Sequence, residues 1–522
     1  MLRTAQVPAA VTALAGLLLL LLSSGCDGGA EEATPPSTAA AASPTAAATT
    51  TAVASDLTAI PMNGTSIVVD STSDSDGRDG ALTLREAIRV ATGDLAAAVL
   101  EPAEADNING TPGPESADAI VFQSSLFPPD APATISLTST LPTLGTGGDS
   151  VVGSGSAVII DGGNQGFNCF QVESDGNTIK GLRIQNCRTA IVLREAAGHN
   201  TIGGAAEGDR NVIGPNAGVG IEIDGDGNVV QGNYMGTDVS GTESRSNAME
   251  GIWIAPGAEN NVIGGSGPGE GNLIAGNNLF GISIDGVGAT GNVVKGNYIG
   301  VDVTGRVALK NRYGLVLAGG AQNNIIGGKE RGEANVISGN QSAGVLIRGS
   351  GTRGNVLKAN LIGPDSSGSE ELRQGTGIWI LQGPQDNIIG GTAQGEGNVI
   401  AHSGTVGVLI DGADTTGNTI RGNSIHSNGR SAIVSTNGGN LGLAQPTIEG
   451  SGPLRGAACP GCTVDVYSGS EEGQVYEGST TTDANGAFTY DGALSGSLVT
   501  ATATDAGGNT SPYSDPFAMP AG

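Results

Sequence analysis

The four residues Gly-Ile-Glu-Ile at 220–223 return in altered form along most of this chain. They recur as Gly-Ile-Trp-Ile at 251–254, Gly-Ile-Ser-Ile at 281–284, Gly-Leu-Val-Leu at 314–317, Gly-Val-Leu-Ile at 344–347, Gly-Ile-Trp-Ile at 377–380 and Gly-Val-Leu-Ile at 407–410. Successive units start 31, 30, 33, 30, 33 and 30 residues apart, so the true period is two units, about 63 residues. Units that are so short, β-branched and alternating predict strands rather than helices.

Each unit is followed by an asparagine with two aliphatic residues, as at 261–263, and then by a third short apolar group. That third group follows a Gly-Gly loop in one kind of coil, whereas the other kind has Asn-Tyr-Ile-Gly, as at 297–300, before a longer loop. Three such strands per coil can bury their apolar side chains only by stacking on the next coil, ~4.8 Å away. Asparagines at equal positions then stack, and their amides can bond along the axis. The sequence therefore predicts an all-β parallel solenoid.

From about 120 to 440 the chain resembles the right-handed parallel β-helix repeat proteins of bacterial surfaces. The most specific phrases are Gly-Asn-Tyr-Ile-Gly at 296–300 and Gly-Gly-Thr-Ala-Gln-Gly-Glu-Gly-Asn-Val-Ile at 390–400. The resemblance implies a right-handed helix. The same family includes polysaccharide lyases, hydrolases and epimerases, so it leaves the function open.

The first residues are typical of an export signal, because Arg3 precedes an apolar run at 11–22. The following Ser-Ser-Gly-Cys resembles a bacterial lipoprotein signal, although Leu22 lies four residues before Cys26 instead of three. We therefore expect a signal peptide at 1–25 and a lipid anchor on Cys26, with ordinary cleavage as the alternative. Residues 26–57, rich in Ala, Thr, Pro and Ser, predict a disordered tether. The protein is expected to be exported, monomeric, and membrane-anchored at the cell surface or extracellular.

Both ends of the predicted solenoid at 119–440 are expected to be covered. Residues 58–118 contain an amphipathic helix at 82–91 and resemble a module with a Cys-Ser-Leu-Arg-Glu-Ala motif, in which Leu82 and Thr83 replace Cys and Ser. Residues 441–522 alternate short strands with Asp- and Gly-rich turns, which predicts a small β-sandwich similar to bacterial Ig-like modules.

Charge and cysteine content narrow the possible partners. A net charge of −28 makes nucleic acid an unfavourable partner and suits cations or neutral glycans, although acidity also keeps an exported protein soluble. Cys169 and Cys187 fall on neighbouring coils and predict a disulfide. Cys459 and Cys462 predict a structural disulfide or two free thiols, since no second pair completes a zinc site.

Acidic residues form one candidate metal site and two periodic rows. Asp74, Asp76 and Asp79 lie in a Gly turn and are candidate Ca²⁺ ligands, with a solvated acidic turn as the simpler interpretation. The periodic rows lie ~10 Å apart along the axis, which indicates solvated turns rather than shared ion sites. One row is Asp209, Glu270, Glu333 and Glu396, and the other is Asp238, Asp302 and Asp365.

The third residue of each four-residue unit should point outwards. This outward stripe runs through Val192, Glu222, Trp253, Ser283, Val316, Leu346, Trp379, Leu409 and Val434. Both tryptophans of the chain lie in it, four coils or ~19 Å apart. We take Trp253 and Trp379, with Glu222 and Ser283, as candidate binding residues for a glycan or a protein partner. The alternative is that a loop or the C-terminal sandwich covers this stripe.

No catalytic residue can be assigned, because no acid–base pair stands out and His199, His402 and His426 fall in unrelated phases of the repeat. The first hypothesis is a lipid-anchored surface protein that binds polysaccharide or a protein partner without catalysis. The second is a carbohydrate-active lyase, hydrolase or epimerase, and the third a structural spacer.

Overall fold

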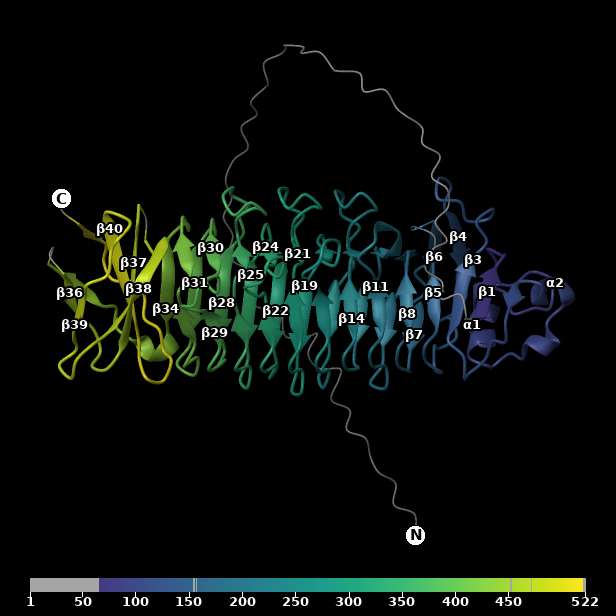
Figure 1. Cartoon of the computed structure of the whole chain (residues 1–522), viewed down its shortest axis with the longest axis horizontal. Coiled ribbons are helices and arrows are strands. Elements are labelled where there is room, and N and C mark those ends of the chain that lie inside the picture. Colours follow the sequence, from purple (N-terminus) through teal and green to yellow (C-terminus); the bar gives the residue numbers. More distant parts are fainter. Residues whose placement is uncertain (1–64, 154, 156, 451–452, 471, 520–522) are drawn as a thin grey trace, which may run out of the picture. The chain divides into compact units, whose positions relative to one another are not determined.

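The computed structural model describes residues 65–153, 155, 157–450, 453–470 and 472–519. The predicted right-handed parallel β-helix is the fold observed. Three long sheets, here named A, B and C, are formed by equivalent strands of successive coils, and Figure 1 shows these coils in chain order between α1 (Leu84–Ala91) and the C-terminal strands. The predicted signal peptide, Cys26 and the tether lie outside the described residues.

Within the described residues, sheets A, B and C contain 13, 11 and 10 strands. Sheet A consists of β2 (Ile108–Asn109), β1 (Thr65–Val69), β3 (Asp118–Phe122), β5 (Ser150–Val152), β8 (Thr178–Lys180), β11 (Thr201–Gly203), β14 (Val229–Gln231), β17 (Val262–Gly264), β20 (Val293–Lys295), β23 (Ile325–Ile326), β26 (Val356–Leu357), β29 (Ile388–Gly390) and β32 (Thr419–Arg421). Sheet B consists of β4 (Ala133–Ser136), β6 (Val158–Asp161), β9 (Leu182–Gln185), β12 (Val212–Ile213), β15 (Tyr234–Met235), β18 (Leu273–Ile274), β21 (Tyr298–Ile299), β24 (Val336–Ile337), β27 (Leu361–Ile362), β30 (Val399–Ala401) and β33 (Ser424–His426). Sheet C consists of β7 (Phe170–Val172), β10 (Ile191–Leu193), β13 (Ile221–Ile223), β16 (Ile252–Ile254), β19 (Phe280–Asp285), β22 (Tyr313–Ala318), β25 (Ala343–Arg348), β28 (Thr376–Leu381), β31 (Val406–Asp411) and β34 (Ser431–Thr436).

The core lies between the three sheets and is built from the repeated aliphatic positions. Ile252 and Ile254 of β16, for example, are fully buried and pair in register with Ile282 and Ile284 of β19. Every coil repeats this arrangement, so each aliphatic side chain stacks on its equivalents above and below, which removes apolar surface from water along the whole solenoid.

The predicted asparagine stacks are present at the corners between the sheets. At the corner before sheet B, the Oδ1 atom of Asn297 accepts from the backbone N–H and the Nδ2 of Asn272 at 3.0 and 2.9 Å. Its own Nδ2 donates to the Ile263 carbonyl and to Oδ1 of Asn335. Each buried amide thus satisfies backbone groups that a sharp corner would otherwise leave unpaired.

The N-terminal end is closed by the predicted helix. Thr83 caps α1, since its Oγ1 accepts from the Glu86 N–H while the Glu86 carboxylate accepts from the Thr83 N–H. Arg85 donates to both carboxylate oxygens of Asp74 and to the carbonyls of Ser139 and Thr140. The parallel stacking begins with β1, one strand before the predicted start of the solenoid at 119. The segment after α1 holds a 3₁₀ turn (Ala97–Val99) and α2 (Pro102–Ala105).

The C-terminal residues form two small antiparallel sheets. One contains β35 (Thr447–Glu449), β36 (Leu454–Ala457) and β39 (Ala487–Tyr490), and the other β38 (Val475–Thr481), β37 (Thr463–Gly469), β40 (Leu498–Thr504) and β41 (Phe517–Ala518). Two contacts join them to the last coil: Arg421 pairs with the buried Asp465 at 2.6 Å, and Ser424 donates to the Gln474 carbonyl. These strands therefore close the end of the solenoid.

Cys169 and Cys187 form the predicted disulfide between neighbouring coils, with their Cα atoms 5.7 Å apart. Cys459 and Cys462 are also joined, which decides between the two alternatives for that pair.

The acidic rows were predicted to be solvated turns, but several of their carboxylates have protein partners. Asp209, Glu333 and Glu396 pair with Lys180, Lys295 and Lys358. Asp365 is 2% exposed and accepts the backbone N–H groups of its own loop, which holds that loop closed.

Candidate functional site

The predicted stripe lies in register on the outer face of sheet C. Glu222 pairs with Trp253, and Trp253 pairs with Ser283, on the adjacent strands β13, β16 and β19. The stripe is neither fully open nor fully covered. Val192, Ser283, Val316 and Leu346 are buried, whereas Glu222, Trp253, Trp379, Leu409 and Val434 are half-buried.

Carboxylates gather around Trp253. Glu222 lies beside Trp253 on the neighbouring strand β13, and Glu250 lies two residues before β16. Asp224 comes directly after β13, and Asp285 is the last residue of β19, the strand on the other side of β16. Arg194 contributes the opposite charge, with its Nη1 3.4 Å from Asp224 Oδ2 and 3.9 Å from Glu222 Oε1. We name Glu222, Asp224, Glu250, Trp253 and Asp285 the Trp253 cluster.

The acids of the Trp253 cluster hold their protons more tightly than free carboxyls. Burial raises the pKa of the Glu250 carboxyl to about 7, and repulsion from Asp285 and Glu222 adds to the rise. Burial also raises the pKa of Glu222, to which the Asp224 charge contributes. The pKa values of Asp224 and Asp285 are raised by burial too, against the attraction of Arg194 and Arg348.

The chemistry of this cluster suits a polyhydroxylated ligand. A half-buried indole offers a flat apolar face of the kind that stacks on a sugar ring, and carboxylates accept hydrogen bonds from hydroxyl groups. A carboxyl with a pKa near neutrality is also the kind of group that can donate a proton in catalysis.

Trp379 has different surroundings from Trp253, although the repeat places both at the same position. It pairs in register with the apolar Leu346 and Leu409 and packs against an apolar cluster that includes Leu346 and Val316. Its Nε1 is buried without a hydrogen-bond partner in the described part of the chain. Sequence reasoning treated the two tryptophans as equivalent, but the structure brings carboxylates to Trp253 and apolar side chains to Trp379.

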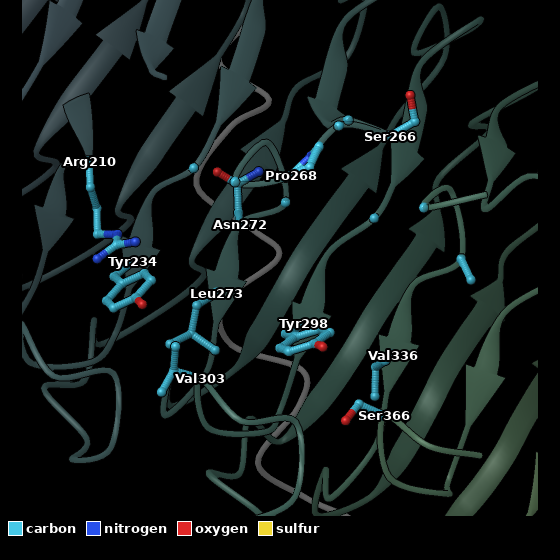
Figure 2. A pocket seen from close by; sticks show the side chains of 18 of the residues that line it. Arg210, Tyr234, Ser266, Pro268, Asn272, Leu273, Tyr298, Val303, Val336 and Ser366 are labelled. Atoms are coloured by element: carbon cyan, nitrogen blue, oxygen red, sulfur yellow. The ribbon is translucent and has the colours of Figure 1, made fainter. Parts of the chain in front are cut away.

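A groove of about 880 Å³ follows the outer face of sheet B (Figure 2). Its floor consists of outward residues from five consecutive strands. They are Tyr234, Leu273, Tyr298, Val336 and Leu361. Glycine-rich turns that precede these strands form one wall, and the long loops that follow them, with Val303 and Ser366, form the other.

Two arginines supply the charge of this groove. The guanidinium of Arg210 lies 4.0 Å above the centre of the Tyr234 ring, and Figure 2 shows the two side chains next to each other. The side chain of Arg331 is exposed on the equivalent turn four coils further on. Among the described residues that line the groove there is no aspartate or glutamate. The sequence feature that could have predicted this groove is the tyrosine of the Asn-Tyr-x-Gly phrase, but sequence analysis assigns that phrase only to the repeat.

The candidate calcium ligands do not converge. Asp74 is engaged by Arg85, and Asp76 pairs with Arg78 and Arg89. The Asp79 carboxylate accepts from the Ala81 N–H. Over the described ranges, no group of three or more His, Cys, Asp or Glu side chains is placed to hold a metal ion. The arginines of the N-terminal cap thus engage two of the three candidate ligands, Asp74 and Asp76.

Comparisons with known proteins agree with the fold. A family model described as a right handed beta helix region matches residues 300–480. No curated protein matches the sequence. The structure is similar to the A-module of the Azotobacter vinelandii mannuronan C-5 epimerase AlgE6, with 15% identity, a TM-score of 0.42, and 71% of this chain and 94% of that chain covered.

Two further solved structures are similar to this chain at lower TM-scores. The periplasmic alginate epimerase AlgG has 14% identity and a TM-score of 0.33, with 62% of this chain and 68% of that chain covered. The Dettilon tailspike protein has 13% identity and a TM-score of 0.32, with 74% of each chain covered. In the described residues no helix is long and apolar enough to cross a membrane.

Proposed function

We propose that this chain is an exported surface protein that binds a neutral glycan at the Trp253 cluster, without catalysis. The observation that carries the proposal is the placement of a half-buried indole among four carboxyl groups and Arg194 on one sheet face. Stacking on the indole would supply affinity, and the carboxyl groups would select hydroxyl-rich ligands and disfavour polyanions. A lipid anchor on Cys26 would keep this face at the cell surface.

The test is binding of the intact exported chain to neutral polysaccharides, such as a β-glucan and a mannan, by affinity electrophoresis and calorimetry. We expect Trp253→Ala to weaken binding roughly tenfold, the loss of one aromatic contact, and Trp253→Phe to retain most of it. Leu409→Ala, on the same stripe but five strands away from Trp253, is the matched control and should bind normally. Binding that is unchanged in Trp253→Ala would refute the proposed site.

A second function is favoured by one observation, the raised pKa of Glu250. Such a carboxyl could act as a general acid in a carbohydrate-active enzyme. Activity assays on neutral and acidic polysaccharides, with and without Ca²⁺, distinguish the two functions. Turnover that disappears in Glu250→Gln while binding remains would establish catalysis, whereas complete inactivity together with Trp253-dependent binding would exclude it for those substrates.

A further inference from the structure

The groove on sheet B has the form of a trough that follows the solenoid axis. Its floor spans five adjacent strands, β15 to β27, and is therefore ~19 Å long. The rings of Tyr234 and Tyr298 belong to strands two steps apart and so lie ~10 Å from each other along this floor. A spacing of this order is comparable with the length of a disaccharide.

Both walls of the trough are continuous because loops two coils apart stack on each other. On the long-loop side, the Val303 N–H donates to the Gly241 carbonyl, and the Ser366 N–H donates to the Gly305 carbonyl. On the turn side, Gly332 lies so close to Ser266 that a Cβ atom would meet the Ser266 carbonyl oxygen. This glycine also has a φ of +86°, so its turn depends on having no side chain. The walls are thus preformed, which lowers the entropic cost of binding a long ligand.

The charge of the trough is opposite to that of the whole chain. The protein carries a net charge of −28, yet the charged residues that line this groove are Arg210 and Arg331. On the adjoining turns Glu270 accepts from the Gly267 N–H and Glu333 pairs with Lys295. Two exposed acids lie outside the groove lining, Glu207 at 4.0 Å from the Arg210 guanidinium and Glu330 next to Arg331 in the sequence. A positive trough on an acidic protein selects anionic ligands through local charge complementarity.

We propose that the sheet B groove is a second binding site, separate from the Trp253 cluster, for a linear acidic polysaccharide whose sugar units carry carboxylate or sulfate groups. Tyr298 stacks on a sugar ring, and Arg331 together with the Arg210 guanidinium above Tyr234 binds the acidic groups. Nucleic acid, the other common linear polyanion, fits less well because its phosphate density requires a broad basic face.

The test is calorimetric titration of the full exported chain with a polyuronate, a sulfated glycan and single-stranded DNA. We expect both acidic glycans, or one of them, to bind, and Arg331→Glu to weaken that binding roughly tenfold, since a bond to a charged group is lost. Lys329→Glu is the matched control, because it makes the same charge change two residues away, outside the groove lining, and should retain near-normal affinity. Tyr298→Ala should weaken binding to a similar extent and Tyr298→Phe should preserve it.

The outcomes are separable from those of the proposed function. Trp253→Ala should leave binding of the acidic glycan unchanged, so either site can fail while the other stands. The second site is refuted if neither acidic glycan binds, if Lys329→Glu is as damaging as Arg331→Glu, or if DNA binds as tightly as the glycans. Circular dichroism of each variant, all at half-exposed or exposed positions, verifies that the fold is kept.

Discussion

Sheets B and C are formed by the same coils, and both turn residues at repeated positions outwards. On sheet C these residues bring Trp253 together with carboxylates, and on sheet B they bring Tyr298 into a groove with arginines. The difference shows that the repeat contains two kinds of position, those that are constrained and those that can vary. The inward aliphatics and corner asparagines are constrained by stacking, whereas the outward positions are free to carry different chemistry on each face.

The two faces also differ in the ladders beneath them. The asparagine ladder at the corner before sheet B is continuous from Asn211 to Asn423. The ladder at the corner before sheet C is interrupted after Asn340 by Gln374 and Ser403, whose side-chain polar atoms have no partner within the described residues. The strands that form the groove are therefore preceded by a complete asparagine ladder, whereas the ladder before sheet C is incomplete near Trp379.

Breaking the continuous ladder should have the largest effect. Asn297→Ala removes a fully buried amide that accepts from two donors of Asn272 and donates to three acceptors, so we expect a loss of about 4 kcal/mol in unfolding free energy. Chemical denaturation followed by circular dichroism measures it. Asn278→Ala, at an exposed position, should change the unfolding free energy by less than about 0.5 kcal/mol. Equal effects of the two substitutions would contradict the assigned role of the ladder.

The buried acid of sheet C should make stability depend on pH. The pKa of Glu250 is raised from 4.5 to about 7, so its stabilising contribution is complete below pH 4.5 and is lost as pH rises through 7. We expect Glu250→Gln to be more stable than the wild type at pH 8, by about 3 kcal/mol, and to have no such advantage at pH 4. Melting temperatures across this range measure the difference. Glu243→Gln, at an exposed position, should follow the wild type, and an advantage of Glu250→Gln that is the same at both pH values would contradict the raised pKa.

Raising the salt concentration should lower the affinity of the sheet B groove for its ligand more than that of the Trp253 cluster. Because the groove relies on arginines, raising the salt from ~0.05 M to ~0.5 M should weaken its affinity for a polyuronate by about tenfold. Binding of a neutral glycan at Trp253 should change by less than about twofold, since stacking is not screened. Calorimetry at the two salt concentrations tests this, and parallel losses on both faces would argue against distinct chemistries.

Repairing the interrupted ladder should give the smallest effect. Gln374→Asn restores the side chain that the other coils use at this corner, so we expect a gain of about 1 kcal/mol in unfolding free energy. The same denaturation experiment applies. A loss of stability would show that the longer glutamine fills space that asparagine leaves empty.

Much of the fold follows from the sequence, because the repeat of about 63 residues identifies which positions stack on one another. The predicted features that the structure contains are the strands, the asparagine ladders, the helix at 84–91 and the Cys169–Cys187 bond. The Trp253 cluster was only partly predictable. Glu250 lies just outside the four-residue unit, and its raised pKa depends on burial that spacing does not encode.

The groove was not predicted because its walls arise from loops two coils apart, such as those of Val303 and Gly241. The calcium site was proposed from a cluster of acids in the sequence, which does not reveal that Arg85 and Arg89 would face them.

Competition between two glycans tests the central claim most directly, namely that the chain has two independent sites of opposite charge preference. The intact exported chain would be saturated with an acidic polysaccharide, and its affinity for a neutral glycan would then be measured by calorimetry. Independent sites predict an unchanged affinity for the neutral glycan in the wild type and its loss in Trp253→Ala alone. Displacement of one glycan by the other would show a single shared site and contradict the account.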